Sequence, residues 1–282
     1  MNNIGIEIEL TGVTRMEVVR ALENLFQSRA IERKSSVTDM PYKFYKIKDW
    51  DGQYWTIVRD RSIESEVYKY KTQNDCNGVD DYDRIPILDD NEAFDSSMYK
   101  TELVSPVLNP KSLKTLFLIV NVIKALGGIT NHSCGIHIHV DKPSNVGDLT
   151  KLFKSWLLKQ DEAFTYFSTD ESRLGKYCKR FDESLVDMNL EFKTEKEFLD
   201  YLTEKFSDES NESRSVRYYA LNFYSIIAHN TVEFRLFNSS LNTKDIASII
   251  SWVVTFAYPI EVGNKYMASL GQYLIPEIKE GA

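Results

Sequence analysis

Apolar and polar residues alternate in several short stretches of this chain of 282 residues. Such alternation predicts β-strands, because successive side chains of a strand point to opposite faces. In residues 3–11, isoleucine or leucine stands at each even position from 4 to 10, and glycine or glutamate stands between them. In residues 131–141, Cys134 to Val140 alternate with Gly135, His137, His139 and Asp141. Each stretch therefore has one aliphatic face for the core and one polar face.

Shorter stretches of the same kind predict further strands at 42–45, 54–60, 98–106, 217–225 and 231–237. The dipeptide Asp51-Gly52 favours a tight turn and predicts a hairpin between the first two of these strands. In 231–237, Glu233 and Arg235 share the face opposite the aliphatic one.

A period of three to four residues predicts helices at 14–30, 112–126, 149–167, 194–206 and 243–258. Thr14 with Glu17, and Thr194 with Glu197, have the spacing of a capping box. We expect an α+β fold with a curved, mostly antiparallel sheet of about six strands. Four helices (14–30, 112–126, 149–167 and 243–258) would cover its aliphatic side. The other side would be an open trough.

The composition is that of a globular protein, with 43% hydrophobic and 27% charged residues. We expect a single domain over 1–282 with an acidic surface insertion at 72–95. The net charge of −8 argues against a nucleic-acid-binding surface, and the most apolar stretch, 246–260, is too short to span a membrane. Three scattered cysteines and a start without a signal-peptide pattern favour a cytoplasmic setting.

Ionisable residues occupy the polar faces of several predicted strands. They are Glu7, Glu9, Glu102, His137, His139, Glu233 and Arg235, with Asp60 at the end of another strand. For His137 and His139 alone, a pair of hydrogen-bonded histidines on a half-buried strand is an equal alternative. Clustered carboxylates repel one another, and a divalent cation removes that repulsion. Carboxylate oxygens favour Mg²⁺, or Mn²⁺, over zinc.

Magnesium keeps part of its hydration shell and takes further ligands from phosphates, so the cluster suggests a nucleoside triphosphate site. Arg235 would neutralise charge on the transferring phosphoryl group. The sequence has neither a Walker loop nor a kinase glycine-rich loop, so metal and side chains would hold the phosphates.

Six motifs occur in one order along the chain, and together they resemble the amidoligase family, which is similar to glutamine synthetase and glutamate–cysteine ligase. They are Gly5-Ile-Glu7-Ile-Glu9, Trp55…Asp60-Arg-Ser62-Ile63, Glu102-Leu-Val-Ser105-Pro106, Asn131…Cys134-Gly135-Ile-His137-Ile-His139-Val, Arg173…Tyr177-Cys178 and Ala220-Leu-Asn222…Thr231-Val-Glu233-Phe-Arg235-Leu-Phe. Arg61 and Ser239-Ser240 depart from the family pattern of glycine and Gly-Thr.

The resemblance implies a fold like the catalytic domain of glutamine synthetase and an ATP-dependent ligase. In that reaction ATP phosphorylates a carboxylate, and an amine attacks the acyl phosphate to give an amide. The resemblance also implies residue roles. Glu7, Glu233 and His137 would hold one magnesium ion, and Glu9 and Glu102 a second. Arg235 would stabilise the phosphoryl group, and His139 would contact the nucleotide. Asp60 would act on the substrate as a catalytic residue beside Glu102 and Arg235. Arg173 and Asn222 would bind the nucleotide or hold the metal ligands in place.

The residues alone leave two alternatives open. A His-x-His motif with acidic residues also suits a metal-dependent hydrolase that activates water. A non-catalytic binding protein could keep the same framework, although buried charges are costly to retain without a purpose. For a ligase, the expected partners are a carboxylate and an amine carried by an amino acid, a peptide or a protein side chain.

Overall fold

The computed structural model describes residues 3–34, 43–66, 68–70, 84–86, 96–182, 184–185, 190–207 and 213–274. The strands are β1 (Ile4–Leu10), β2 (Ile31–Lys34), β3 (Lys43–Lys48), β4 (Tyr54–Val58), β5 (Tyr68–Tyr70), β6 (Arg84–Pro86), β7 (Thr101–Val104), β8 (Gly135–Asp141), β9 (Leu221–Asn222) and β10 (Thr231–Asn238). The helices are α1 (Arg15–Phe26), α2 (Leu113–Ala125), α3 (Val146–Tyr166), α4 (Glu171–Leu174), α5 (Glu195–Phe206), α6 (Ser225–His229), α7 (Thr243–Ala257) and α8 (Ile260–Leu274). Two 3₁₀ helices cover Ser96–Tyr99 and Ser213–Tyr218.

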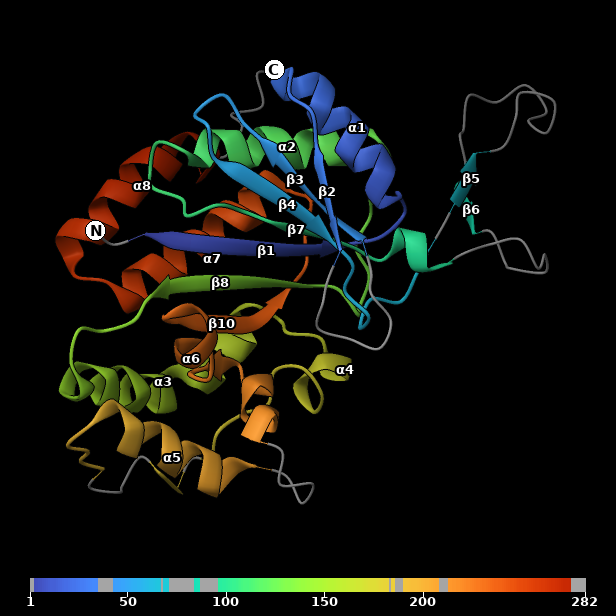
Figure 1. Cartoon of the computed structure of the whole chain (residues 1–282). Helices are drawn as coiled ribbons and strands as arrows, with labels where there is room; N and C mark the ends of the chain where they lie inside the picture. The colour runs from blue at the N-terminus through green and yellow to red at the C-terminus, as the bar shows by residue number, and fades with distance from the viewer. Residues whose placement is uncertain are drawn as a thin grey trace, which may run out of the picture.

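Eight strands form one open sheet in the order β2-β3-β4-β7-β1-β8-β10-β9, with every neighbouring pair antiparallel (Figure 1). Strands β5 and β6 form a separate two-stranded ribbon. The N-terminal strand β1 lies in the middle of the sheet, so segments far apart in the sequence flank it on both sides. The predicted α+β class is confirmed.

The core lies between the aliphatic face of the sheet and the helices. On β1 the side chains of Ile4, Ile6, Ile8 and Leu10 are at most 1% exposed. Helix α1 contacts β3 and β4, and α7 contacts β8. From α3, Trp156 packs edge-on against Phe234 of β10, with ring centroids 6.0 Å apart. Helices thus cover the aliphatic face, as the apolar stripes predict.

Local sequence signals explain where the helices begin and end. At α1 both halves of the predicted capping box form, and Gln27 ends the helix in the left-handed conformation with φ of 51°. At α5 the side chain of Thr194 accepts a hydrogen bond from the backbone N–H of Glu197. The apolar stretch around 246–260 forms the buried helix α7 that was predicted. In the described part of the chain, no helix is long and apolar enough to cross a membrane.

Several predictions differ from the structure. The sheet has eight strands instead of about six, and one of them, β2, was not predicted. The strand predicted at 217–225 is wrong for most of its length. A 3₁₀ helix ends at Tyr218, and α6 begins at Ser225. Asn230 then adopts the left-handed conformation that ends α6 and directs the chain into β10. Most of the predicted insertion 72–95 lies outside the described residues.

Two of the three cysteines lie in the described part of the chain. Cys134 and Cys178 are free and buried, and Cys76 lies outside the described residues. Burial raises the pKa of the Cys134 thiol to about 12, since the thiolate would lose its hydration. Burial raises the pKa of the Cys178 thiol as well, so both described cysteines favour the protonated form.

Replacing Trp156 by alanine tests the packing of α3 on the sheet. Trp156 is fully buried, so W156A should lower the free energy of unfolding by about 3–5 kcal/mol through loss of burial and cavity formation. Urea denaturation followed by circular dichroism measures this change. The control L158A removes a side chain that is 67% exposed on the same helix, and should change stability by no more than about 0.5 kcal/mol. Equal effects of the two substitutions would contradict the assigned packing.

Candidate active site

The antiparallel register brings the ionisable residues onto one face of the sheet. Glu7 of β1 lies opposite His137 of β8, and Glu9 lies opposite Glu102 of β7. Glu233 of β10 lies opposite His139 of β8. Because paired residues of antiparallel strands point to the same side, all six side chains share the face opposite the aliphatic core. The predicted trough, hereafter the polar face, is therefore lined by four carboxylates and two imidazoles.

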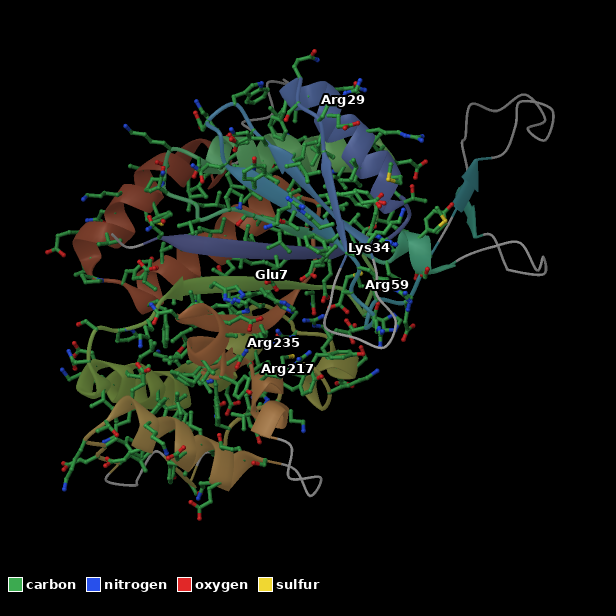
Figure 2. The ribbon with its side chains drawn as sticks, in the orientation of Figure 1. Glu7, Arg29, Lys34, Arg59, Arg217 and Arg235 are labelled. Atoms are coloured by element: carbon green, nitrogen blue, oxygen red, sulfur yellow. The ribbon has the colours of Figure 1, made fainter. Side chains whose placement is uncertain are left out.

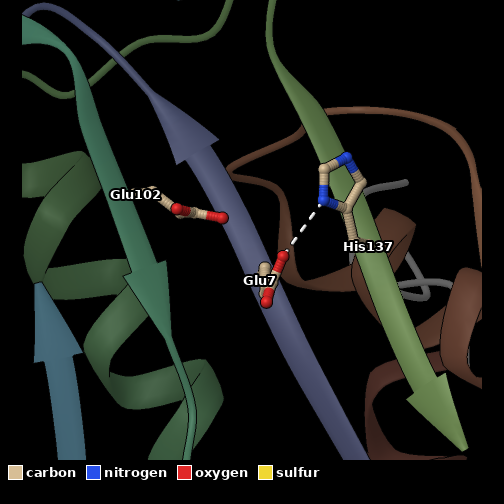
Figure 3. Close-up of side chains that lie close together, drawn as sticks. All are labelled: Glu7, Glu102 and His137. Carbon is tan, nitrogen blue, oxygen red and sulfur yellow. Dashed lines mark hydrogen bonds and ion pairs between the residues drawn. The ribbon is translucent and has the colours of Figure 1, made fainter. Parts of the chain in front are cut away.

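Three of these side chains, Glu7, Glu102 and His137, come from three adjacent strands (Figure 3). The Nδ1 atom of His137 lies 3.1 Å from Oε2 of Glu7. One ligand atom from each of the three residues lies within 4.8 Å of the other two. Their geometry and residue types suit a cation.

A second group consists of Glu7, His139 and Glu233 and shares Glu7 with the first. Nε2 of His139 lies 3.4 Å from Oε1 of Glu7 and is buried without a hydrogen bond from any described residue. Nδ1 of the same ring contacts the hydroxyls of Thr231 at 2.9 Å and Ser225 at 3.2 Å. These two hydroxyls orient the imidazole, so that Nε2 faces the carboxylates.

The third group, Glu9, Asp60 and Glu102, contains carboxylates alone. Burial raises the pKa of Glu102 well above its ordinary value, and repulsion by Glu7, Asp60 and Glu9 raises it further. Burial also raises the pKa of Glu9. Glu7 behaves differently. Burial alone would raise its pKa, but interactions with the imidazoles of His137 and His139 hold it well below the ordinary value. The two imidazoles therefore offset the burial of Glu7, whereas the neighbours that shift the pKa of Glu102 are all carboxylates.

Arg173 and Gly135 hold Glu9 in place. The backbone N–H of Gly135 donates to Oε2 of Glu9 at 2.5 Å, and Nη1 of Arg173 lies 4.0 Å from the same oxygen. A Cβ atom at position 135 would lie 2.2 Å from Nη2 of Arg173. Glycine is therefore required for this close approach. Arg173 is 1% exposed, so it supports the cluster from a buried position.

Two neighbouring side chains, from Arg235 and Asn222, hold the carboxylate of Glu233 in place. Nη1 of Arg235 lies 2.5 Å from Oε1 of Glu233, and Nδ2 of Asn222 donates to Oε2 at 2.6 Å. Burial would raise the pKa of Glu233, but the charges of Arg235 and the two histidines lower it overall. Glu233 is therefore held as a carboxylate. The side-chain oxygen of Asn222 is buried and has no hydrogen bond among the described residues.

Two cavities open on either side of Glu7 and His139. The first, of about 220 Å³, is bounded by Arg217, Arg235, Asn222, Tyr224, Ser225, Ala228, His229, Glu7, His139 and Glu233. Figure 2 labels Glu7, Arg217 and Arg235, which are three of the charged residues that line this cavity. The second, of about 270 Å³, lies over the start of β1 and the end of β7, where Pro106 and Val107 add apolar surface. His229 lines both cavities.

The comparison with known families gives one match. A family described as "putative amidoligase enzyme" matches residues 1–257, which is most of the chain. The chain belongs to this amidoligase family. A comparison with curated proteins finds no match. The family is one of amide-bond-forming ligases, so this amidoligase is assigned to the ligases that act on a carboxylate and an amine.

The structure brings together most of the residues that the sequence singled out for the site. Glu7, Glu9, Glu102, His137, His139, Glu233 and Asp60 of this amidoligase all take part in at least one of the three groups. His139 lies beside Glu7 and Glu233, and its predicted contact with the nucleotide stays a prediction. Arg173 lies behind Glu9, and its predicted contact with a cofactor stays a prediction. Sequence reasoning did not predict Arg217, Tyr224 and His229 as site residues. Arg217 lies in a 3₁₀ helix, and Tyr224 and His229 lie at the two ends of the short helix α6, so none is on a clearly periodic stretch.

Glu102→Gln tests whether repulsion within the amidoligase cluster costs stability. Glu102 binds its proton more tightly in the folded than in the unfolded protein, so its stabilising contribution is present below pH 4.5 and is lost as the pH rises. In chelator, E102Q should therefore melt at a higher temperature than the wild type at pH 8, and the gain should shrink at pH 4.5. Each kcal/mol corresponds to about 2–4 °C.

Two further measurements complete this test. Mg²⁺ or Mn²⁺ should raise the melting temperature of the wild type at pH 8 and raise that of E102Q less. The control E204Q changes an exposed carboxylate of α5 and should respond to cations as the wild type does. If E102Q melted below the wild type at pH 8 in chelator, the assigned repulsion would be wrong.

Gly135→Ala tests the contact between Arg173 and β8. The added methyl group would overlap the guanidinium, and relieving that clash should cost about 1–3 kcal/mol of stability. The matched control is G175A, since a Cβ atom at Gly175 would meet no atom within 4 Å. Chemical denaturation compares the two variants. A tolerated G135A would show that Arg173 lies elsewhere.

Proposed function

We propose that this amidoligase is an ATP-dependent carboxylate–amine ligase that uses Mg²⁺ or Mn²⁺. The observation that carries the proposal is the convergence of four carboxylates and two imidazoles from β1, β7, β8 and β10 on one face of the sheet. Such groups are costly to bury together without a compensating cation. Membership of the family supports the amide-forming reaction.

The residues present fit divalent cations. Glu7 belongs to two of the three candidate groups, so it would help to hold a cation with Glu102 and His137 and another with His139 and Glu233. Glu9 and Asp60 would complete a further position with Glu102. Carboxylate-rich groups of this kind suit a hard cation. When bound, the cations would neutralise the carboxylates and the charge of the phosphates.

The first cavity suits the phosphates of ATP. It contains Arg217 and Arg235 directly beside Glu7 and Glu233, so cationic side chains and metal-binding carboxylates face the same space. Arg235 would stabilise the phosphoryl group in transit, and Arg217 would bind the same triphosphate. The nucleoside would occupy the neighbouring cavity, where Pro106 and Val107 offer apolar contact on the far side of Glu7.

The proposed reaction has two steps. A carboxylate oxygen of the substrate attacks the terminal phosphorus of ATP, which forms an acyl phosphate and releases ADP. The amine then attacks the carbonyl carbon, forms the amide and releases phosphate and a proton. The side chains contribute by positioning and by charge, because phosphoryl transfer depends mainly on these two effects. Asn222 and Arg235 would keep Glu233 oriented toward the reacting groups.

Glu7→Gln and Glu233→Gln test the proposal directly. Each substitution keeps the shape of the side chain and removes a charge that would bind a cation, so ATP turnover should fall by about 10²–10³-fold or more. The assay supplies Mg²⁺ and ATP with a panel of amino acids and peptides. Mass spectrometry identifies the condensed product.

The control E204Q should retain wild-type turnover, and circular dichroism should show folded protein for all three variants. Wild-type turnover by both E7Q and E233Q would contradict the assigned metal ligands. Hydrolysis of the peptides without ATP would contradict the ligase assignment and favour a metal-dependent hydrolase.

A further inference from the structure

The polar face continues beyond the cluster onto the strands β4, β3 and β2. Val58 of β4 lies opposite Glu102, and Lys46 of β3 lies opposite Thr56 of β4. Residues at alternate positions along each strand share a face, so Lys48 and Arg33 also point to the polar side. Arg33, Lys46 and Lys48 are exposed, and together they form what we call the basic face.

The basic face has a local charge opposite to that of the whole chain, whose net charge is −8. No carboxylate stands on the polar side of β2, β3 or β4, all of which the structure describes. Glu32 points to the other side of β2, where it pairs with Lys43 at 3.0 Å. Asp60 follows β4 and belongs to the cluster. The three cations therefore face solvent without neutralising partners on the same strands.

Apolar side chains lie between these cations. Ile31 is 38% exposed and Tyr54 is 42% exposed, and Lys48 lies 5.9 Å above the ring of Tyr54. Four strand spacings separate β2 from β1, which gives roughly 19 Å between the edge of the basic face and Glu7. An extended peptide of about six residues spans that distance. A single amino acid bound at the cluster does not reach it.

We propose that the carboxylate substrate is an acidic peptide that lies across the basic face and presents one carboxylate to the cluster. This inference rests on the proposed ligase function, because that reaction requires the carboxylate of a substrate to bind beside Glu7, Glu9 and Glu102. Further carboxylates of the peptide pair with Arg33, Lys46 and Lys48, and its backbone and aliphatic groups contact Ile31 and Tyr54. A nucleic acid supplies negative charge as well, but it carries no carboxylate to activate.

Peptide binding without ATP tests this inference separately from catalysis. Fluorescence anisotropy compares labelled hexaglutamate with labelled hexaglutamine in the presence of Mg²⁺. We expect the wild type to bind hexaglutamate and not hexaglutamine. The affinity should fall between low salt and about 0.15 M salt, because salt screens exposed charges.

Two triple variants with the same change in net charge locate the binding surface. R33E/K46E/K48E reverses the basic face and should weaken hexaglutamate binding by about tenfold or more. The matched control K34E/K114E/K124E reverses a lysine on the other side of β2 (Lys34, labelled in Figure 2) and two exposed lysines of α2. It should weaken binding by less than about threefold, and thermal denaturation should show that both variants fold.

Three results would overturn the inference. They are no binding of hexaglutamate by the folded wild type, equal weakening by both triple variants, and tighter binding of a single-stranded oligonucleotide of the same charge. The last result would assign the basic face to nucleic acid. A failure of the ligase assay with intact hexaglutamate binding would instead count against the proposed function alone, since the binding experiment contains no ATP.

Discussion

Mutual repulsion among buried carboxylates is the constraint on which the arrangement of the polar face depends. Glu7, Glu9, Glu102 and Glu233 lie on one side of the three strands β1, β7 and β10, and each is largely removed from water. Two imidazoles and the guanidinium of Arg235 offset this repulsion at the β8–β10 end. At the β7 end, Glu102 and Glu9 have Asp60 as an additional carboxylate neighbour. This imbalance makes the cluster a strong candidate for cations and explains the unequal pKa shifts of its members.

The aliphatic face is what allows such a cluster to persist. The hydrophobic core beneath β1, β8 and β10 fixes the register of the strands, because a shift of one residue would move isoleucines to the polar side. That register in turn determines which ionisable residues become neighbours. The alternation of apolar and polar residues thus produces both the buried core on one side of the sheet and the charged cluster on the other.

The alternation was readable from the sequence, and so was the face on which each candidate residue lies. Strand order was not, because the pairing of β1 with β7 and β8 depends on contacts between segments about 100 residues or more apart. The sequence therefore indicated Glu7 and His137 as members of one cluster without indicating that they lie on directly paired strands. Arg217 was placed in a strand, although it lies in a 3₁₀ helix, since a single turn carries too little periodicity to identify. The approach of Arg173 to Gly135 also depends on tertiary contacts, which no local pattern in the sequence reveals.

The central position of the N-terminal strand has a consequence for how the protein is made. Strand β1 leaves the ribosome before the other strands of the sheet. Its neighbour β8 follows more than 120 residues later, and β10 later still. During synthesis the aliphatic side of β1 therefore stays without its neighbouring strands until these are made. Because its contacts are far apart in the sequence, we expect the sheet to fold slowly. Nascent chains that end before β10 lack Glu233 and cannot assemble the full polar face. The polar face is therefore complete only in chains whose synthesis has passed that strand.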